Sequence, residues 1–205
     1  YSSDVNGVLF NKSKTELIQY PAGNTRTSYT IPNTVKNVSD SAFQYCSNLS
    51  SVIISNGVVS IGNDAFEYCT SLTSVTVPDS VSSIGDNVFL GCSNIVSFDI
   101  GSGVASIGDG VFTGCSAVTE ITVDPNNKYY SNDNYGVLFN KNKTILMHLS
   151  HLNKIDKINL WHYNINSLKN KLFKINVKSK CPICSGSKLR DFPHKKSKNK
   201  SKHTF

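Results

Sequence analysis

Histidine is missing from the first 147 residues, because all five histidines of this 205-residue chain lie at or after position 148. Without an imidazole, residues 1–147 offer no histidine general base and no nucleophile–histidine pair. No apolar run approaches the roughly 20 residues that a membrane-spanning helix needs. Charged residues make up only 17% of the chain. We therefore expect a non-enzymatic globular protein without catalytic residues, metal, cofactor or small-molecule substrate.

The chain also lacks an initiator methionine and a signal-peptide pattern, since it opens at Tyr1. We expect a fragment or processed product, so the missing leader says little about location.

Charge is divided unevenly between two parts of the chain. Residues 1–147 contain 7 Lys and Arg against 12 Asp and Glu, a net charge of −5, whereas residues 148–205 contain 14 against 2, a net charge of +12. This contrast predicts two parts, 1–147 and 148–205, with different physical character.

What the chain does have is a repeat of 23 residues. Self-similarity at a fixed period is typical of solenoids, in which stacked units bury an apolar spine that one unit cannot bury alone. We predict a mainly β solenoid of four to five units, with repeats over about residues 26–124. Two of the repeated columns are Phe43, Phe66, Phe89 and Phe112, and Cys46, Cys69, Cys92 and Cys115.

Each unit reads as a short strand followed by a turn and a second extended piece. Apolar residues alternate with Thr and Ser over residues 72–77, which predicts a strand with one buried face. Pro78 ends that strand because it has no amide donor. The outward positions form a hydroxyl-rich sheet, which is either a candidate binding face or simply good solvent-facing β surface. The predicted binding face consists of Ser51, Ile53, Ser74, Thr76, Val96, Ser97, Asp99, Glu120 and Thr122.

The unit resembles the BspA-like class of leucine-rich repeats, of the surface-antigen type. The resemblance rests on the order L-x-x-V-x-V-P-x-x-V-x-x-I-G-x-x-x-F-x-x-C and on PDSVSSIGDNVFLGCS at residues 78–93, and it covers about residues 7–147. It implies a leucine-rich repeat solenoid with hairpin-like flanking segments. It also implies a surface or secreted protein that adheres to host cells, matrix proteins or other microbes.

A second similarity lies outside the repeat. GVLFNKSKTEL at residues 7–17 returns as GVLFNKNKTIL at residues 136–146, identical at nine of eleven positions. An apolar run, a polar turn and a second apolar run predict β-hairpins at 7–20 and 136–147. The first hairpin leads into repeats, but after Met147 the repeat pattern stops. Residues 148–205 are then either a poorly ordered basic tail or the product of a reading frame that slips near Met147.

Two columns allow more than one interpretation. The cysteine column could form disulfides, but parallel Cβ vectors would strain them, so we favour buried free thiols. Asp40, Asn63, Asp86 and Asp109 form a column that could hold a calcium ion. The favoured interpretation is that these side chains stabilise turns by bonding to their own backbone.

The last 58 residues carry their own motifs. Cys181-Pro182-Ile183-Cys184 is half of a zinc site, but the following His194 and His203 miss the usual spacing. The lysine-rich run at 195–202 could bind nucleic acid or an anionic membrane, or be a solvated tail. Our first hypothesis is an adhesion or protein-binding module. The alternatives are nucleic-acid or membrane binding through the tail, and a non-functional fragment of a longer repeat protein.

Overall fold

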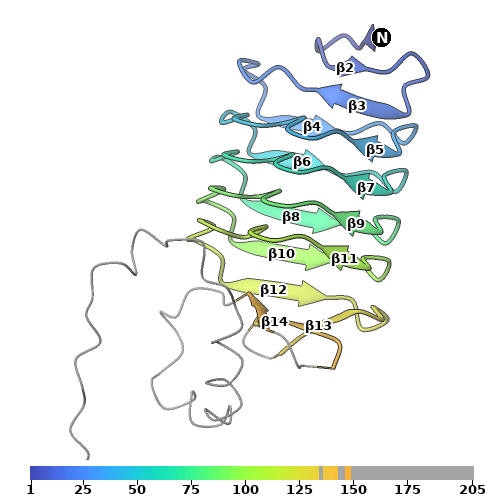
Figure 1. Ribbon diagram of the computed structural model, residues 1–205. Helices are drawn as coiled ribbons and strands as arrows, with labels where there is room; N and C mark the ends of the chain where they lie inside the picture. Colours follow the sequence, from blue (N-terminus) through green and yellow to red (C-terminus); the bar gives the residue numbers. More distant parts are fainter. Residues whose placement is uncertain (134–135, 143–145, 149–205) are drawn as a thin grey trace, which may run out of the picture. The chain divides into compact units, whose positions relative to one another are not determined.

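The structure, a computed structural model, describes residues 1–133, 136–142 and 146–148. In these residues all regular structure is extended, with fifteen strands and no helix. The chain winds into coils that stack on one another (Figure 1). Paired strands of successive coils are offset by 23 residues, as in Ser74↔Ser97 and Ser60↔Ser83. The prediction of a mainly β solenoid is confirmed.

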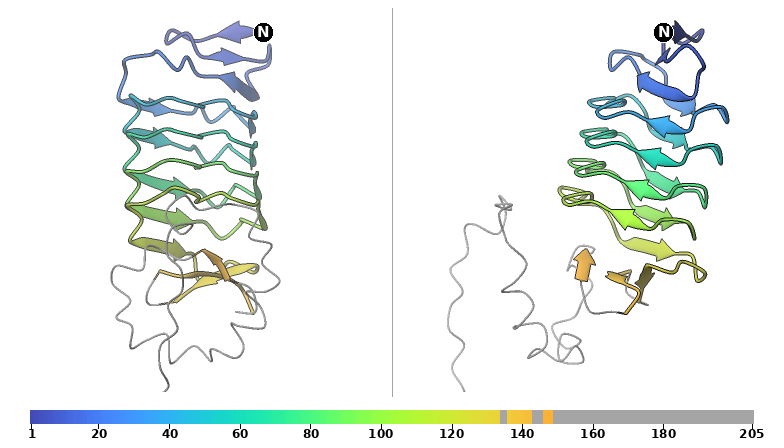
Figure 2. Two further views of the ribbon diagram at one scale, coloured as in Figure 1. Left: turned by 60° about the vertical axis from the view of Figure 1, so that its left-hand side comes forward. Right: turned by 45° about the vertical axis from the view of Figure 1, so that its right-hand side comes forward.

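Two stacks of parallel strands form two sides of each coil (Figures 1 and 2). Because every coil presents the same residue types at the same positions, each strand finds an identical register on its neighbour. The first stack contains β5 (Asn37–Val38), β7 (Ser60–Ile61), β9 (Ser83–Ile84) and β11 (Ser106–Ile107). The second contains β4 (Ser28–Thr30), β6 (Ser51–Ile53), β8 (Ser74–Val77), β10 (Ser97–Ile100) and β12 (Glu120–Val123).

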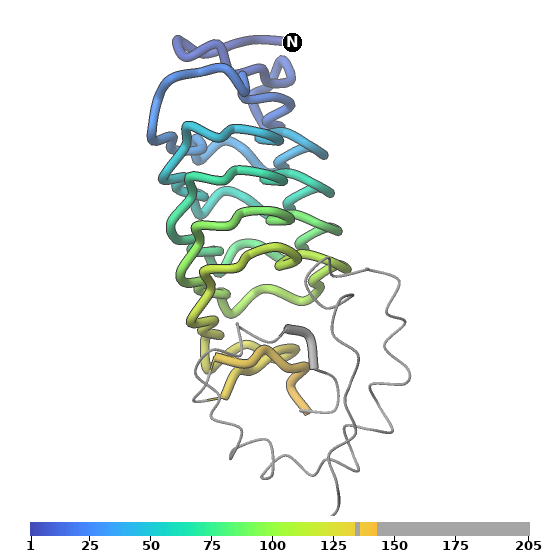
Figure 3. The backbone as a smooth tube through the Cα atoms, turned by 90° about the vertical axis from the view of Figure 1, so that its left-hand side faces the viewer, coloured from blue at the N-terminus to red at the C-terminus, as the bar shows by residue number. Residues whose placement is uncertain are grey.

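Turns rather than strands form the remaining side of the coil, and they too are bonded from coil to coil. The amide of Phe66 donates to the carbonyl of Val88 at 2.9 Å, and the amide of Phe89 donates to the carbonyl of Val111 at 3.1 Å. Backbone polar groups of the turns are therefore satisfied by the next coil, which the tube trace shows directly beneath (Figure 3).

The core between these sides is largely aliphatic and contains a column of aromatic rings. Phe43 and Phe66 stack at 4.8 Å between ring centroids, and Phe66 and Phe89 at 5.4 Å. Phe98 occupies the position that Val75 has one coil earlier, and its ring packs 5.2 Å from Phe89. Its centroid lies 4.8 Å from that of Phe112. The extra ring thus joins the lower part of the phenylalanine column.

The two similar hairpin sequences fold into matching three-stranded antiparallel blocks. Ser2 pairs with Phe10 as Ser131 pairs with Phe139, and each block has a register shift at its Leu-Phe step. A carboxylate holds each block at its start: Asp4 Oδ1 accepts from the Val8 amide and Asp133 Oδ1 from the Val137 amide, both at 3.0 Å. The blocks comprise β1 (Ser2–Ser3), β2 (Leu9–Phe10) and β3 (Glu16–Gln19), and β13 (Tyr130–Asn132), β14 (Leu138–Asn140) and β15 (Leu146–His148).

A single residue marks the change from coils to the second block. Asn127 follows Val81 and Val104 in a buried column, and it is itself 1% exposed. Its Nδ2 donates to the carbonyls of Gly101 and Val104 at 2.9 and 3.0 Å, while its Oδ1 accepts from the Tyr130 amide at 2.8 Å. The amide side chain therefore replaces an apolar contact with hydrogen bonds that turn the chain out of the repeat.

Four predictions lie outside the described residues. They are the character of the 148–205 segment, the frame slip near Met147, the C-x-x-C pair at 181–184 and the lysine-rich run at 195–202.

Candidate protein-binding surface

The nine residues predicted as a binding face lie on one side of the second strand stack. Eight of them belong to β6, β8, β10 and β12, and Val96 immediately precedes β10. The eight strand residues alternate with buried residues such as Val75 and Ile121, because successive side chains of a strand point to opposite faces. Val96 adjoins Ser97 and lies outside this alternation. All nine are exposed or half-buried: Ser51, Ile53, Ser74, Thr76, Val96, Ser97, Asp99, Glu120 and Thr122.

The face combines hydroxyl groups with two apolar side chains. Ile53 and Val96 are 58% and 48% exposed. Asp99 lies between two threonines of neighbouring coils: Thr76 Oγ1 donates to Asp99 Oδ2 at 3.3 Å, and Thr122 Oγ1 donates to Asp99 Oδ1. This carboxylate is therefore held by hydroxyls of the coils on either side. The face offers a partner apolar contact and fixed hydrogen-bonding groups.

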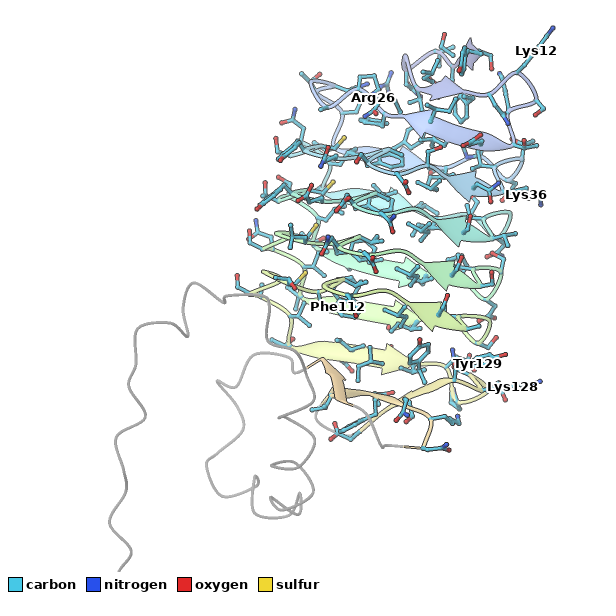
Figure 4. All side chains as sticks on the ribbon, viewed as in Figure 1. Lys12, Arg26, Lys36, Phe112, Lys128 and Tyr129 are labelled. Carbon is cyan, nitrogen blue, oxygen red and sulfur yellow. The ribbon has the colours of Figure 1, made fainter. Side chains whose placement is uncertain are left out.

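Charge on the middle coils is of one sign. Between Lys36 and Lys128 the sequence contains nine Asp and Glu but no Lys or Arg. Lys12, Arg26 and Lys36 lie towards the N-terminal end of the stack and Lys128 lies at the far end (Figure 4). The middle coils therefore present carboxylates without internal basic partners, which favours cationic groups on a binding partner.

The Asp and Asn column joins successive coils through hydrogen bonds. Asp40 Oδ1 accepts from the Asn63 amide at 2.7 Å, Asn63 Oδ1 from the Asp86 amide at 2.8 Å, and Asp86 Oδ1 from the Asp109 amide at 2.8 Å. We expected these side chains to bond to their own turns, but they bond to the backbone of the next coil. The described residues contain no group of three His, Cys, Asp or Glu that could hold a metal ion.

Glycine precedes each of the three donor amides of this column, at Gly62, Gly85 and Gly108, for a steric reason. A Cβ on Gly85 would lie 2.5 Å from Asn63 Oδ1, 2.8 Å from the Asn63 amide nitrogen and 2.9 Å from the Gly62 carbonyl carbon. The glycine of the Ile-Gly pair is therefore required by both the backbone and the Asx side chain of the preceding coil. A shallow groove of about 760 Å³ runs beside this column, lined by Glu16, Asp40, Asn63 and residues of the first strand stack.

The four cysteines of the repeat are free and buried, as we favoured. Sγ of Cys69, Cys92 and Cys115 donates to the carbonyl of the phenylalanine 26 residues earlier, at 3.0, 3.0 and 3.1 Å. Burial raises the pKa of Cys92 to about 12 and also raises the pKa of Cys115. Cys92 and Cys115 therefore act as small packed groups, because the thiolate is the reactive form of cysteine and a raised pKa disfavours it.

Two exposed tyrosines form a feature that the sequence reasoning missed. Tyr45 and Tyr68 have φ angles of 60° and 54°, and their rings stack at 5.3 Å with an interplanar angle of 2°. The left-handed backbone region costs a bulky residue roughly 1–3 kcal/mol. The same column continues as Gly91 and Gly114, with φ angles of 73° and 77°. That Tyr–Tyr–Gly–Gly column was the available sequence signal.

Fold and surface together define a class of protein: a parallel β-solenoid with one repeat per coil and an exposed strand face. The chain matches the family model for the BspA-type leucine-rich repeat region, in six copies over residues 22–145, and it belongs to this family. Leucine-rich repeat proteins of this kind are generally protein-binding or adhesion proteins and are typically not enzymes.

Among solved structures, the chain is similar to the pneumococcal vaccine antigen PcpA, with 29% identity and a TM-score of 0.59 over 61% of this chain and 31% of that one. It is also similar in fold to a leucine-rich repeat protein from Bacteroides capillosus, with 22% identity and a TM-score of 0.52 over 59% of this chain and 96% of that one. A Treponema pallidum leucine-rich repeat protein gives 25% identity and a TM-score of 0.48, over 52% of this chain and 51% of that one.

The chain thus spans about a third of the length of PcpA and about half of the treponemal protein. No curated protein matches it. Within the residues that the structure describes, no helix could span a membrane.

Proposed function

We propose that this protein is a non-enzymatic adhesion module, displayed at the cell surface or secreted, which binds a protein ligand of a host cell, the matrix or another microbe. The observation that carries the proposal is the continuous exposed face across β6, β8, β10 and β12, on which Ile53 and Val96 are solvent-accessible. Membership of a family of protein-binding repeats supports it, as does likeness to a bacterial antigen.

The chemistry of the face favours binding over catalysis. Its carboxylate Asp99 accepts hydrogen bonds from two threonines of adjacent coils. Residues 1–147 contain no histidine to act as a general base. A broad face without a reactive group recognises a partner through many small contacts, and exposed apolar side chains supply more of the binding energy than serines do.

The test is binding of the full chain to epithelial cells and to immobilised fibronectin, laminin and collagen over a salt titration. We expect Ile53→Ser combined with Val96→Ser to weaken binding about tenfold, because both substitutions remove apolar contact area and leave the strands intact. A matched control, Val59→Ser, removes an apolar side chain that is 41% exposed and lies outside these strands.

The basic tail is tested in the same assay by changing the five lysines of residues 195–202 to glutamine. Binding that persists in this variant and depends little on salt supports the strand face. Binding that disappears in this variant, and that falls steeply with salt in the parent chain, assigns the activity to tail electrostatics and overturns the proposal.

A further inference from the structure

The stacked pair Tyr45 and Tyr68 lies on the turn side of the coils, away from the strand face. The two side chains are 56% and 41% exposed. Gln44 and Glu67 precede them in the two coils, and Gln44 Nε2 donates to Glu67 Oε2. We call these four residues the tyrosine edge. It combines two parallel rings with a carboxylate.

The fold does not require tyrosine at these positions. Gly91 and Gly114 occupy the same place in the next two coils with the same sign of φ, and Gly91 N bonds to the Thr113 carbonyl at 2.8 Å as Tyr68 N bonds to the Leu90 carbonyl at 2.7 Å. Glycine adopts this conformation without the strain that a Cβ brings. The Tyr68 ring also covers Gly91, where a Cβ would lie 2.4 Å from Tyr68 Cδ1. The two tyrosines place exposed rings where the unstrained choice is glycine, and this strain points to a role in addition to packing.

The surroundings of the rings indicate the chemistry of a partner. Glu67 adjoins Tyr68, and Asp64 lies in the same turn at a half-buried position. Neither has a basic neighbour within its own coil or the next, because no Lys or Arg occurs between Lys36 and Lys128. A ring face beside a carboxylate suits a guanidinium group, which stacks on aromatic rings and pairs with carboxylates at the same time.

We propose that the tyrosine edge binds an arginine-bearing segment of a protein partner, with a guanidinium against the stacked rings and Glu67. The inference rests on the proposed protein-binding function and names a second contact surface and its partner chemistry. Arginine suits the edge better than lysine because the planar guanidinium matches both the ring and the carboxylate, whereas an ammonium group is a strongly hydrated point charge.

The test uses the full chain and three blocked hexapeptides, of arginine, lysine and glutamate, with binding measured by calorimetry at fixed ionic strength. We expect the arginine peptide to bind more tightly than the lysine peptide. Residues 148–205, with a net charge of +12, attract the glutamate peptide, and the tyrosine substitutions should leave that binding unchanged. Tyr45→Gly combined with Tyr68→Gly should weaken arginine binding about five- to tenfold without changing the net charge, because the ring contacts are lost. The same change should leave the melting temperature equal or higher, because glycine fits the left-handed backbone.

Four further variants make the test decisive. Tyr45→Phe combined with Tyr68→Phe keeps the rings and should keep arginine-peptide binding. Tyr45→Asn combined with Tyr68→Asn places a residue that tolerates the left-handed conformation but has no ring, and it should lose that binding. Glu67→Gln should weaken binding more than Asp124→Asn, which removes the same charge at the other end of the coils. Unchanged arginine binding in the glycine variant, or equal losses in Glu67→Gln and Asp124→Asn, would show general charge attraction and overturn the inference.

Failure here is separable from failure of the proposed function. If the tyrosine variants leave peptide binding unchanged while Ile53→Ser with Val96→Ser abolishes cell binding, only the tyrosine edge is refuted. If no strand-face variant alters binding to cells or matrix proteins, the proposed function itself fails.

Discussion

Replacing Gly85 with alanine probes the contact on which the stacking of coils depends. The new Cβ would lie 2.8 Å from the Asn63 amide nitrogen and 2.9 Å from the Gly62 carbonyl carbon, as well as 2.5 Å from Asn63 Oδ1. Two of these three atoms belong to the backbone, so no side-chain rotation relieves the overlap. Overpacking of a tight site costs about 1–3 kcal/mol.

The Gly85→Ala substitution also removes a hydrogen bond. Asn63 Oδ1 accepts from the Asp86 amide at 2.8 Å, and a methyl group at Gly85 displaces that oxygen. Loss of such a bond adds about 1 kcal/mol. We therefore expect Gly85→Ala to lower the free energy of unfolding by about 2–4 kcal/mol. At about 2–4 °C per kcal/mol for a chain of this size, the melting temperature falls by about 4–16 °C.

The assay is urea unfolding of the full chain followed by far-UV circular dichroism, with a thermal scan as a second measure. Gly23→Ala is the matched control, because no atom lies within 4 Å of its Cβ and its φ is outside the left-handed region. We expect that control to be neutral or stabilising by about 0.4–1 kcal/mol, since alanine restricts the unfolded chain.

A double variant separates the two causes. Asn63→Ala removes Oδ1 but leaves the backbone atoms at 2.8 and 2.9 Å from the new Cβ, so it should not rescue Gly85→Ala. Full rescue would show that only the side chain obstructs the methyl group. If Gly85→Ala lies within about 0.5 kcal/mol of the parent protein, as an ordinary surface change does, the steric account of the Ile-Gly pair is refuted.

Three other changes test the ends, the core and the thiols of the coils. Asn127→Val restores the apolar residue type of its column. It should nevertheless destabilise the protein by about 2–3 kcal/mol in urea unfolding, because buried carbonyl and amide partners lose their hydrogen bonds. A gain in stability would contradict this prediction. Phe98→Val likewise restores the residue type that the preceding coil has at this position. It should lower stability by about 2–3 kcal/mol, because ring contacts are lost and a cavity forms. An unchanged thermal midpoint would contradict this prediction. For Cys92 the folded pKa of about 12 lies above the unfolded value, so the contribution of this thiol to stability is complete at neutral pH. That contribution falls by about 1.4 kcal/mol per pH unit above about pH 8.5. Between pH 8 and pH 10 the parent protein should therefore lose more stability in urea titrations than Cys92→Ala does, and equal losses in the two proteins would refute the assignment.

Much of the fold could be predicted from the sequence because the repeat fixes geometry through spacing alone. Residues 23 apart occupy the same place in successive coils, so Phe43, Phe66 and Phe89 had to share one column once the chain was a solenoid. Alternation over β8 likewise placed Thr76 outward and Val75 inward. The outward orientation of the strand residues was thus predictable from their alternation.

The tyrosine edge was not predictable in the same way. Tyr45 and Tyr68 matched a column that continues with Gly91 and Gly114, and such a mixture reads as a variable position. Only the backbone angles show that glycine is the unstrained residue there and that the two rings stack. Sequence spacing gives the column of a residue, whereas φ and ring orientation depend on how the turn closes.

The sequence by itself determined the class of fold, the period of the coils and which columns are buried. The three-dimensional arrangement decided which neighbour each polar group uses. Asp40 accepts from the next coil, and Asn127 closes the repeat. Ser39 stands where later coils have glycine, and its hydroxyl donates to Glu16. The physical reason is that burial follows from periodic spacing, which one coil already shows, whereas a directional hydrogen bond or a steric contact exists only after the next coil has docked.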